Sequence, residues 1–172
     1  MTADLGPLAS RFFQVAYVVR DIAAAEAWWK RVSGISSWFR MNDVRFGADC
    51  HLRGAPAHLS IGYLRGTQIE LIEPVRGASL YAEFLASRGA GLHHLAFDVP
   101  DFDATVSALV DCGLELLAYG QVRGPGKRFA YFDCEARGAS VIEILGFDDA
   151  TRAFMTQIKE RSAAGAKLGE PA

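Results

Sequence analysis

The sequence predicts an α+β fold: two βαβββ repeats that form one cupped, eight-stranded mixed sheet, followed by a C-terminal helix. Two matches between the halves of the chain predict this arrangement. Residues 14–22 match residues 94–102, 80 positions later, and residues 68–72 match residues 141–145, 73 positions later. Because the first match opens a unit and the second closes it, the same unit occurs twice.

Each unit is predicted to begin with a short strand and an amphipathic helix. Asp21 and Asp101 follow the strands directly and are suitable N-cap residues. Apolar residues then recur at helical spacing until Gly34 and Gly113, where a left-handed cap is most easily formed. Three further strands complete each unit, near residues 37–46, 57–64 and 67–73 in the first and 114–119, 128–134 and 140–145 in the second.

The remaining segments predict two more helices. Asp148 is expected to cap the last of them, with Phe154, Met155 and Ile158 on one face. Each repeat alone is too small to bury its sheet face, so both are expected to pack as one fold. The predicted segments are a first βαβββ module over residues 10–75, a linker helix over 76–91, a second module over 92–147, and a C-terminal helix and tail over 148–172.

Composition narrows the class of protein. Of the 172 residues, 51% are hydrophobic and 22% charged, which is typical of a globular domain. The net charge of −2 favours neither a nucleic acid nor an anionic membrane as partner. The apolar run 15–19 is too short to span a membrane, and no signal sequence is evident. Cys50, Cys112 and Cys134 are widely spaced and predict free thiols in a cytoplasmic protein.

The repeat places two glutamates at equivalent positions, and this pair is the strongest indication of a functional site. Glu70 and Glu143 stand at equivalent positions in the last strands, each between two aliphatic residues that face the other way. A carboxylate in such a strand is costly unless it is paired, hydrogen-bonded or bound to a metal. The alternative is that both glutamates lie on an exposed sheet face that carries scattered charges. This alternative is disfavoured because the two glutamates occupy equivalent positions in the repeat.

The first strands contribute a second equivalent pair, Gln14 and His94. If the modules pack about a pseudo-two-fold axis, these side chains and both glutamates converge on one point. One imidazole, two carboxylates and one amide oxygen suit a divalent ion such as Zn, Ni, Co, Mn or Fe. By simple alternation along the strand, His93 is expected to face the opposite side of the sheet and to be structural.

Residues 12–147 resemble the vicinal oxygen chelate superfamily, also called the glyoxalase/bleomycin resistance/dioxygenase fold. The resemblance is carried by the segments FQVAYVVRDIAAAEAWW, QIELIEP, GLHHLAFDVPDFDATV and KRFAYFDCEARGASVIEIL. Within the superfamily the chain is most similar to methylmalonyl-CoA epimerase-like and glyoxalase I-like proteins. In that family, each module supplies one metal ligand from its first strand and one Glu or Gln from its last. By motif position, the resemblance implies the metal ligands Gln14, Glu70, His94 and Glu143.

Gln14 departs from the epimerase pattern, in which this position is usually His, and is similar instead to the eukaryotic glyoxalase I set. The reaction is therefore left open between an isomerase or epimerase and a glyoxalase-like lyase. In either case, a divalent ion would stabilise the enediolate formed when a proton leaves the carbon next to a carbonyl. Glu143 is the first choice for the catalytic base, and Glu70 the second.

Two other classes of protein share this fold. Extradiol dioxygenases use two histidines and one carboxylate on iron, and this chain has one histidine among the four positions, which disfavours an oxygenase. A metal-free small-molecule binding or resistance protein is the alternative to the enzyme. Such a binding protein is expected to lack the four metal-ligand positions. This chain retains polar residues at all four, which argues against that class.

Several residues are candidates for substrate binding, and they are compatible with more than one class of substrate. Arg123, Lys127 and Arg128 surround two glycines and are candidates to bind a phosphate, a carboxylate or a CoA tail, with a solvated hairpin as the alternative. Trp38 is a candidate to line an apolar pocket. An acyl-CoA, a glutathione adduct and an aromatic or terpenoid catabolite all remain candidates for the small-molecule substrate.

A homodimer is also expected, because the open sheet leaves edges and an apolar rim that a second copy can cover. We expect the site itself to be built within one chain, since the helical linker resembles a packed connector. The apolar residues proposed for the interface are Phe12, Phe13, Trp28, Trp29, Phe154, Met155 and Ile158.

Overall fold

The computed structural model describes residues 6–45, 55–121, 128–137 and 141–164. A short 3-10 helix, η1 (Gly6–Arg11), leads into the first module. The elements of that module, in chain order, are β1 (Phe12–Val18), α1 (Ile22–Ser33), β2 (Phe39–Val44), β3 (Ala57–Leu64) and β4 (Thr67–Pro74).

The second module repeats this order after a connecting helix, α2 (Leu80–Arg88). A last helix, α4 (Asp149–Ala164), follows it. The elements of the second module are β5 (Gly91–Asp98), α3 (Phe102–Asp111), β6 (Glu115–Gln121), β7 (Arg128–Asp133), the short η2 (Glu135–Arg137) and β8 (Val141–Gly146).

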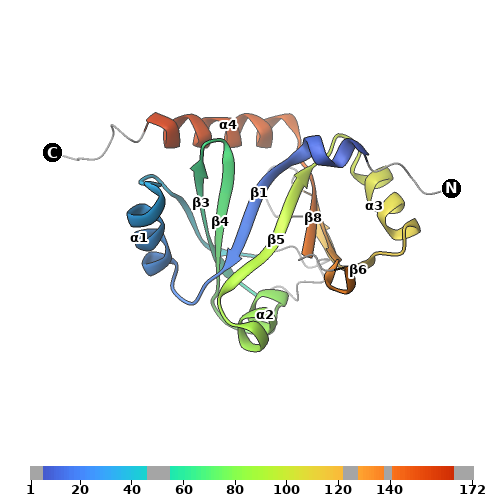
Figure 1. The fold of residues 1–172 in the computed structure, drawn as a ribbon, viewed down its shortest axis with the longest axis horizontal. Coiled ribbons are helices and arrows are strands. Elements are labelled where there is room, and N and C mark those ends of the chain that lie inside the picture. Colours follow the sequence, from blue (N-terminus) through green and yellow to red (C-terminus); the bar gives the residue numbers. More distant parts are fainter. Residues whose placement is uncertain (1–5, 46–54, 122–127, 138–140, 165–172) are drawn as a thin grey trace.

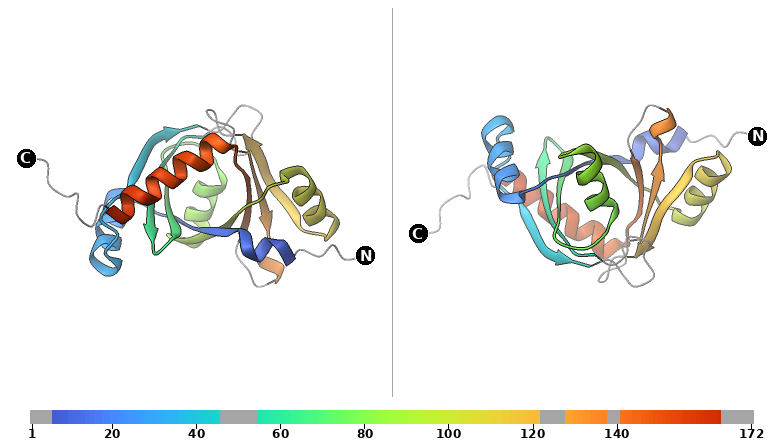
Figure 2. Two further views of the ribbon diagram at one scale, coloured as in Figure 1. Left: turned by 90° about the horizontal axis from the view of Figure 1, so that it is seen from above. Right: turned by 90° about the horizontal axis from the view of Figure 1, so that it is seen from below.

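All eight strands form one mixed sheet in the order β2-β3-β4-β1-β5-β8-β7-β6. The modules meet where β1 and β5 pair antiparallel, while β1 with β4 and β5 with β8 are parallel pairs. The sheet curves so that its two edges bend toward the same side, as the two end views show (Figure 2). The predicted α+β fold of two βαβββ repeats is therefore confirmed.

The helices cover the sheet in two ways (Figure 1). α1 packs against β3 and β4, and α3 packs against β8, so each covers the outer face of its own module. α2 and α4 lie at opposite ends of the half-barrel, with α4 running along the end where β3 and β4 turn. Among the described residues, no helix combines the length and the apolar character needed to cross a membrane.

The capping residues predicted from the repeat are confirmed. The Asp21 carboxylate accepts a hydrogen bond from Ala24 N at 2.9 Å, and Asp101 accepts one from Ala104 N at 3.0 Å. These bonds satisfy backbone donors that the first turn of a helix leaves free. Gly34, with φ of 79°, ends α1 in the left-handed conformation that glycine adopts at little cost.

Strand alternation divides the sheet into two apolar faces. On β1, Ala16 and Val18 belong to the inner core, whereas Val15 and Tyr17 pack against α1 on the outside. The inner core also includes Tyr81 from α2, which closes one end of the half-barrel. Polar side chains on the inner face are thus removed from bulk water.

A β-bulge at His93 interrupts this alternation. Ala16 pairs with His94, but the next residue of β1, Tyr17, pairs with Leu92, so one residue of β5 is extra. The extra residue does not take the opposite face. The His93 ring lies 6.0 Å from the ring of Tyr131 in the inner core. The expectation that His93 faces the other side of the sheet is therefore corrected.

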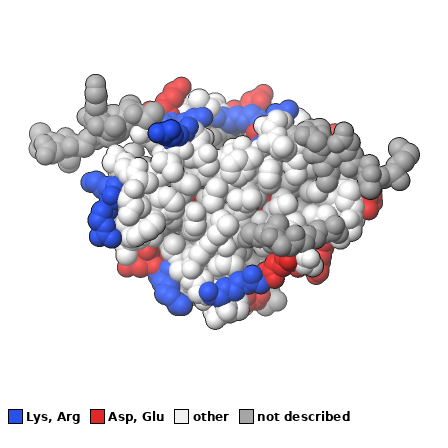
Figure 3. Space-filling view, viewed as in Figure 1, with Lys and Arg blue, Asp and Glu red and all other residues white. Residues whose placement is uncertain are grey.

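The apolar residues proposed for an interface divide into two groups. Phe13, Trp29 and Met155 are half-buried and Ile158 is buried, so these residues pack within the chain. Phe12, Trp28 and Phe154 are 40%, 49% and 39% exposed. In the space-filling view, Lys, Arg, Asp and Glu lie mainly around the rim, and the middle of this face, over β1 and β5, is mostly uncharged (Figure 3).

Candidate functional site

The four polar residues predicted from the repeat come together on the inner face of the half-barrel. They stand on four adjacent strands, β4, β1, β5 and β8, and all come from one chain. Gln14, Glu70, His94 and Glu143 are 1%, 4%, 0% and 2% exposed. These side chains therefore interact with one another and with the inner core rather than with bulk water.

Their placement follows from the strand register. Ala16 is the partner of both Glu70 and His94, so these two side chains flank an alanine in one row across the sheet. Ala96 is likewise the partner of Gln14 and Glu143 in the adjacent row. The two rows are related by the pseudo-two-fold symmetry of the repeat.

Two carboxylates approach one imidazole nitrogen. His94 Nε2 lies 3.1 Å from Glu143 Oε2 and 3.7 Å from Glu70 Oε2. Gln14 Oε1 and His94 Nε2 are buried and have no hydrogen-bond partner within the described residues. Buried polar atoms are normally hydrogen-bonded, so these two atoms indicate a missing partner.

A divalent cation fits this set of donors. Ligands held at about 2.0–2.2 Å from one ion lie roughly 3–3.6 Å apart, similar to the distances from His94 Nε2 to the two carboxylates. As it stands, no group of three or more His, Cys, Asp and Glu side chains in the described part of the chain is arranged as a metal site. The carboxylates would therefore have to turn toward a common point, and Gln14 would add the fourth donor.

His93, which sequence alternation placed elsewhere, contacts the site directly. Its Nδ1 lies 2.8 Å from His94 Nδ1, so one of the two rings donates a hydrogen bond to the other. Burial, together with His94 and Arg88, lowers the pKa of His93 to about 2, so its ring is neutral. When His94 donates this hydrogen bond, the lone pair on its Nε2 faces the two glutamates.

Two tyrosines from different elements add hydroxyl groups near the carboxylates. Tyr131 pairs with Glu143 across β7 and β8, and its ring lies 5.1 Å from that of His94. Its hydroxyl is 2.8 Å from the hydroxyl of Tyr81 on α2. Burial raises the pKa of Tyr131 well above its usual value, and the nearby Glu143 carboxylate raises it further, so the hydroxyl keeps its proton.

Sequence reasoning missed these neighbours for identifiable reasons. The bulge at His93 cannot be recognised from the types of the neighbouring residues. Tyr81 lies on the connecting helix α2, which belongs to neither repeat. Tyr131 was open to detection, because it shares a face with Phe129 in a strand adjacent to that of Glu143.

Two of the residues suggested for substrate binding, Arg128 and Trp38, do not lie on this inner face. Arg128 points toward α3, where it forms an ion pair with Asp103 and stacks 4.3 Å over Phe102. Trp38 packs on the outer face, where a Cβ at Gly62 would lie 2.9 Å from its ring. Trp38 also lines a cavity of about 210 Å³ beside α4, so its suggested role in an apolar pocket stays a prediction, as does the suggested role of Arg128. Arg123 and Lys127 lie outside the described residues.

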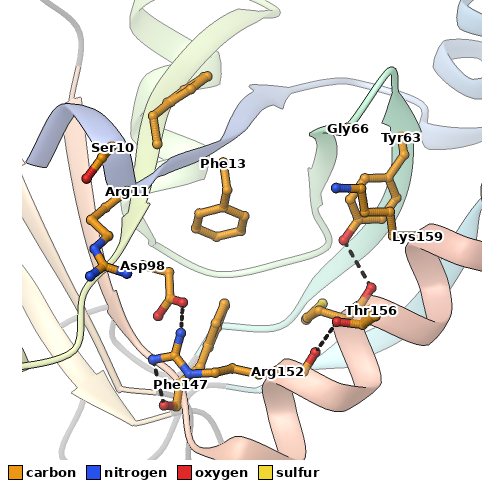
Figure 4. Close-up of a pocket in the computed structure, with 12 residues that line it drawn as sticks. Ser10, Arg11, Phe13, Tyr63, Gly66, Asp98, Phe147, Arg152, Thr156 and Lys159 are labelled. Atoms are coloured by element: carbon orange, nitrogen blue, oxygen red, sulfur yellow. Dashed lines mark hydrogen bonds and ion pairs between the residues drawn. The ribbon is translucent and has the colours of Figure 1, made fainter.

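A separate cavity of about 350 Å³ lies between α4, the end of η1 and the β3–β4 turn (Figure 4). Arg152, on α4, forms an ion pair with Asp98 at one side of it. Tyr63 and Met155 line it as well, and they link the cavity to the inner face through hydrogen bonds.

Two βαβββ modules are joined at β1 and β5, and each of the four central strands contributes one of the four predicted polar residues; this arrangement defines a protein of the vicinal oxygen chelate type. The family model described as the Glyoxalase/Bleomycin resistance protein/Dioxygenase superfamily matches residues 13–132. Since this match covers more than half of the chain, the protein belongs to that superfamily, as the resemblance predicted.

Solved structures share the fold at low sequence identity. Methylmalonyl-CoA epimerase from Mycobacterium tuberculosis is 23% identical with a TM-score of 0.62, over 85% of this chain and 93% of that one. A variant of Streptomyces coelicolor methylmalonyl-CoA epimerase, in complex with 2-nitronate-propionyl-CoA, is 20% identical with a TM-score of 0.63, over 80% and 96%. A hypothetical protein from Bacillus halodurans is 16% identical with a TM-score of 0.63, over 81% and 95%. No curated protein matches the chain.

Proposed function

We propose that this protein is a divalent-metal-dependent isomerase or epimerase that moves a proton on the carbon next to a carbonyl. The observation that carries the proposal is the approach of Glu70 and Glu143 to His94 Nε2, at 3.7 and 3.1 Å, in a buried site. Membership of the superfamily and the shared fold of several epimerases support the same class.

Gln14, Glu70, His94 and Glu143 are the residues that would hold the ion. When bound, the ion would act as a Lewis acid and stabilise negative charge on the substrate oxygens. The donor set accepts Zn, Ni, Co, Mn or Fe, because it combines one imidazole with hard oxygen ligands. His93 would hold the His94 ring in the orientation that directs Nε2 to the centre.

Glu143 is assigned as the general base, with Glu70 as the second choice. The Glu143 carboxylate would take the α-proton and form a new O–H bond, while the C–H electron pair forms the C=C bond of the enolate and the carbonyl π pair moves onto the oxygen. Return of the proton to the same carbon gives epimerisation, and return to the neighbouring carbon gives a glyoxalase-type isomerisation. Tyr131, paired across the strands from Glu143, keeps a hydroxyl group beside this carboxylate.

An acyl-CoA thioester is the first substrate class to test. The Streptomyces coelicolor epimerase that shares this fold is in complex with a propionyl-CoA analogue. A thioester carbonyl makes the adjacent C–H acidic enough for a carboxylate base assisted by a cation. Glutathione adducts and aromatic or terpenoid catabolites are the next classes.

The test begins with metal content and then measures exchange. We expect the purified protein to contain about one divalent ion per chain, and dialysis against a chelator to lower its melting temperature. In D₂O, (2R)- or (2S)-methylmalonyl-CoA should gain deuterium at the α-carbon only with the metal-loaded protein. Absence of metal, together with a melting temperature that does not change with added Zn, Ni, Co, Mn or Fe, would overturn the metal site.

A metal-free binding protein is the second candidate. It is favoured by one observation: in the part of the chain that the structure describes, the His and Glu side chains are close but are not arranged as a completed metal site. For such a protein, small apolar or aromatic ligands should raise the melting temperature equally before and after chelator treatment. Metal analysis therefore separates the two candidates directly.

A further inference from the structure

A series of hydrogen bonds runs from α4 to Gln14. The Tyr63 hydroxyl donates to the backbone oxygen of Met155 at 3.3 Å, and Gln68 Nε2 donates to the Tyr63 hydroxyl oxygen at 2.7 Å. Gln14 Nε2 then donates to Gln68 Oε1 at 2.8 Å. The outer end of this series, at Tyr63 and Met155, lines the cavity beside α4 (Figure 4).

The direction of these bonds is fixed at the helix. A backbone oxygen only accepts, so with the Tyr63 hydroxyl donating to Met155, its oxygen accepts from Gln68. The amide of Gln68 is thereby turned with its oxygen toward Gln14, which must present its nitrogen. The remaining atom, Gln14 Oε1, is buried without a hydrogen-bond partner within the described residues.

Three further observations support a role beyond packing. Gln14 and Gln68 are each 1% exposed, so water does not substitute readily for the missing bonds. The residue equivalent to Gln68 in the second module is Val141, so the fold itself does not require a polar side chain there. Burial raises the pKa of Tyr63, which keeps its hydroxyl protonated and able to donate.

We propose that Tyr63 and Gln68 are positioning residues: they hold the Gln14 amide with its oxygen toward the metal centre and its N–H groups away from the two glutamates. This inference rests on the proposed metal-binding function. An amide turned over would direct two N–H donors at the carboxylates and offer no lone pair to a cation. The orientation is therefore set by α4, an element that belongs to neither module.

The test compares metal affinity in variants that break or bypass the series. Tyr63→Phe removes the hydroxyl, and we expect Mn²⁺ affinity, measured by titration calorimetry, to fall on the order of 10- to 100-fold. Met155→Leu is the matched control, since it removes the sulfur but keeps the backbone oxygen that accepts from Tyr63. Its Mn²⁺ affinity should equal that of the wild type.

A second background separates orientation from stability. Glutamate has two equivalent oxygens and needs no fixed orientation, so in a Gln14→Glu protein the additional Tyr63→Phe change should leave Mn²⁺ affinity unchanged. Thermal melts without metal accompany each titration. A structural role alone would weaken binding in both backgrounds, in parallel with a loss of melting temperature, and would overturn the inference.

The two proposals fail in different ways. If the wild-type protein binds no Mn²⁺, Zn²⁺ or Co²⁺, the proposed function is wrong. If the wild type binds a metal and Tyr63→Phe binds it equally well, the metal site stands and the positioning role of Tyr63 is wrong.

Discussion

Ala16 and Ala96 occupy equivalent places in the two modules, and each stands between two of the four polar residues. Ala16 separates Glu70 from His94, and Ala96 separates Gln14 from Glu143. Both alanines are fully buried. A larger side chain at either position would therefore stand directly between two of the four polar residues.

Enlarging either alanine is therefore expected to block the centre. Ala16→Val or Ala96→Val adds two methyl groups beside the donors, which should abolish metal binding measured by calorimetry. Overpacking should also lower stability by about 1–3 kcal/mol. Ala130→Val, a fully buried alanine on the outer face, is the control. It should lower the melting temperature and leave metal affinity intact, and equal loss of metal affinity in all three variants would contradict the prediction.

Glu143→Gln tests the assignment of the base. The amide retains a coordinating oxygen, so the protein should keep most of its metal but lose on the order of 10²-fold or more in turnover. The measurement is deuterium incorporation at the substrate α-carbon alongside metal content. Undiminished exchange would move the role of the base to Glu70.

Substitutions at Glu70 should rank by their ability to coordinate. Glu70→Gln keeps an oxygen donor and should weaken metal binding less than Glu70→Ala, which removes the donor and leaves a cavity. Both variants are compared by titration with the same ion. The reverse order of affinities would place Glu70 outside the metal site.

His93 gives a prediction about the orientation of the His94 ring. His93→Phe removes the partner of His94 Nδ1, and we expect metal affinity to fall by about 10- to 100-fold. His93→Gln retains a hydrogen-bonding group and should restore part of the loss. If the two variants bind metal equally tightly, packing against α2 is the only role of this ring.

The mostly uncharged middle of the outer face, over β1 and β5, leads to a prediction about the oligomeric state. Phe12 and Leu92, on β1 and β5, are 40% and 42% exposed. We expect a dimer in light scattering at micromolar concentration, and Leu92→Lys should shift it toward the monomer because a buried charge opposes association. A monomer mass for the wild type, with metal added, would contradict this.

Much of the fold followed from the sequence because the two modules share their patterns. Asp21 and Asp101 cap equivalent helices, and the match between Glu70 and Glu143 placed both carboxylates on the inner face. Local patterns of this kind survive in the residue types, since caps and strand alternation depend on near neighbours.

What the sequence did not predict depends on contacts between distant segments. The bulge that turns His93 inward depends on its pairing with β1, and the hydrogen bonds from Tyr63 depend on where α4 crosses the end of the half-barrel. Arg128 was a candidate for substrate binding because it adjoins other cations and two glycines in a predicted loop, and the sequence did not show that its side chain pairs with Asp103 on α3. Residue type does not reveal these partners, because they are set by tertiary packing.

The antiparallel pairing of β1 with β5 makes the candidate site depend on complete assembly of both modules. Gln14 and Glu70 come from the first module, and His94 and Glu143 come from the second. Neither half therefore carries more than two of the four residues, so the proposed ion would bind all four only after the modules have docked. Binding then favours the docked state by mass action, by about 2.7 kcal/mol when free metal exceeds its dissociation constant a hundredfold. If the proposed site binds metal, added metal would therefore stabilise the contact between the two modules and protect the chain from proteolysis that requires their separation.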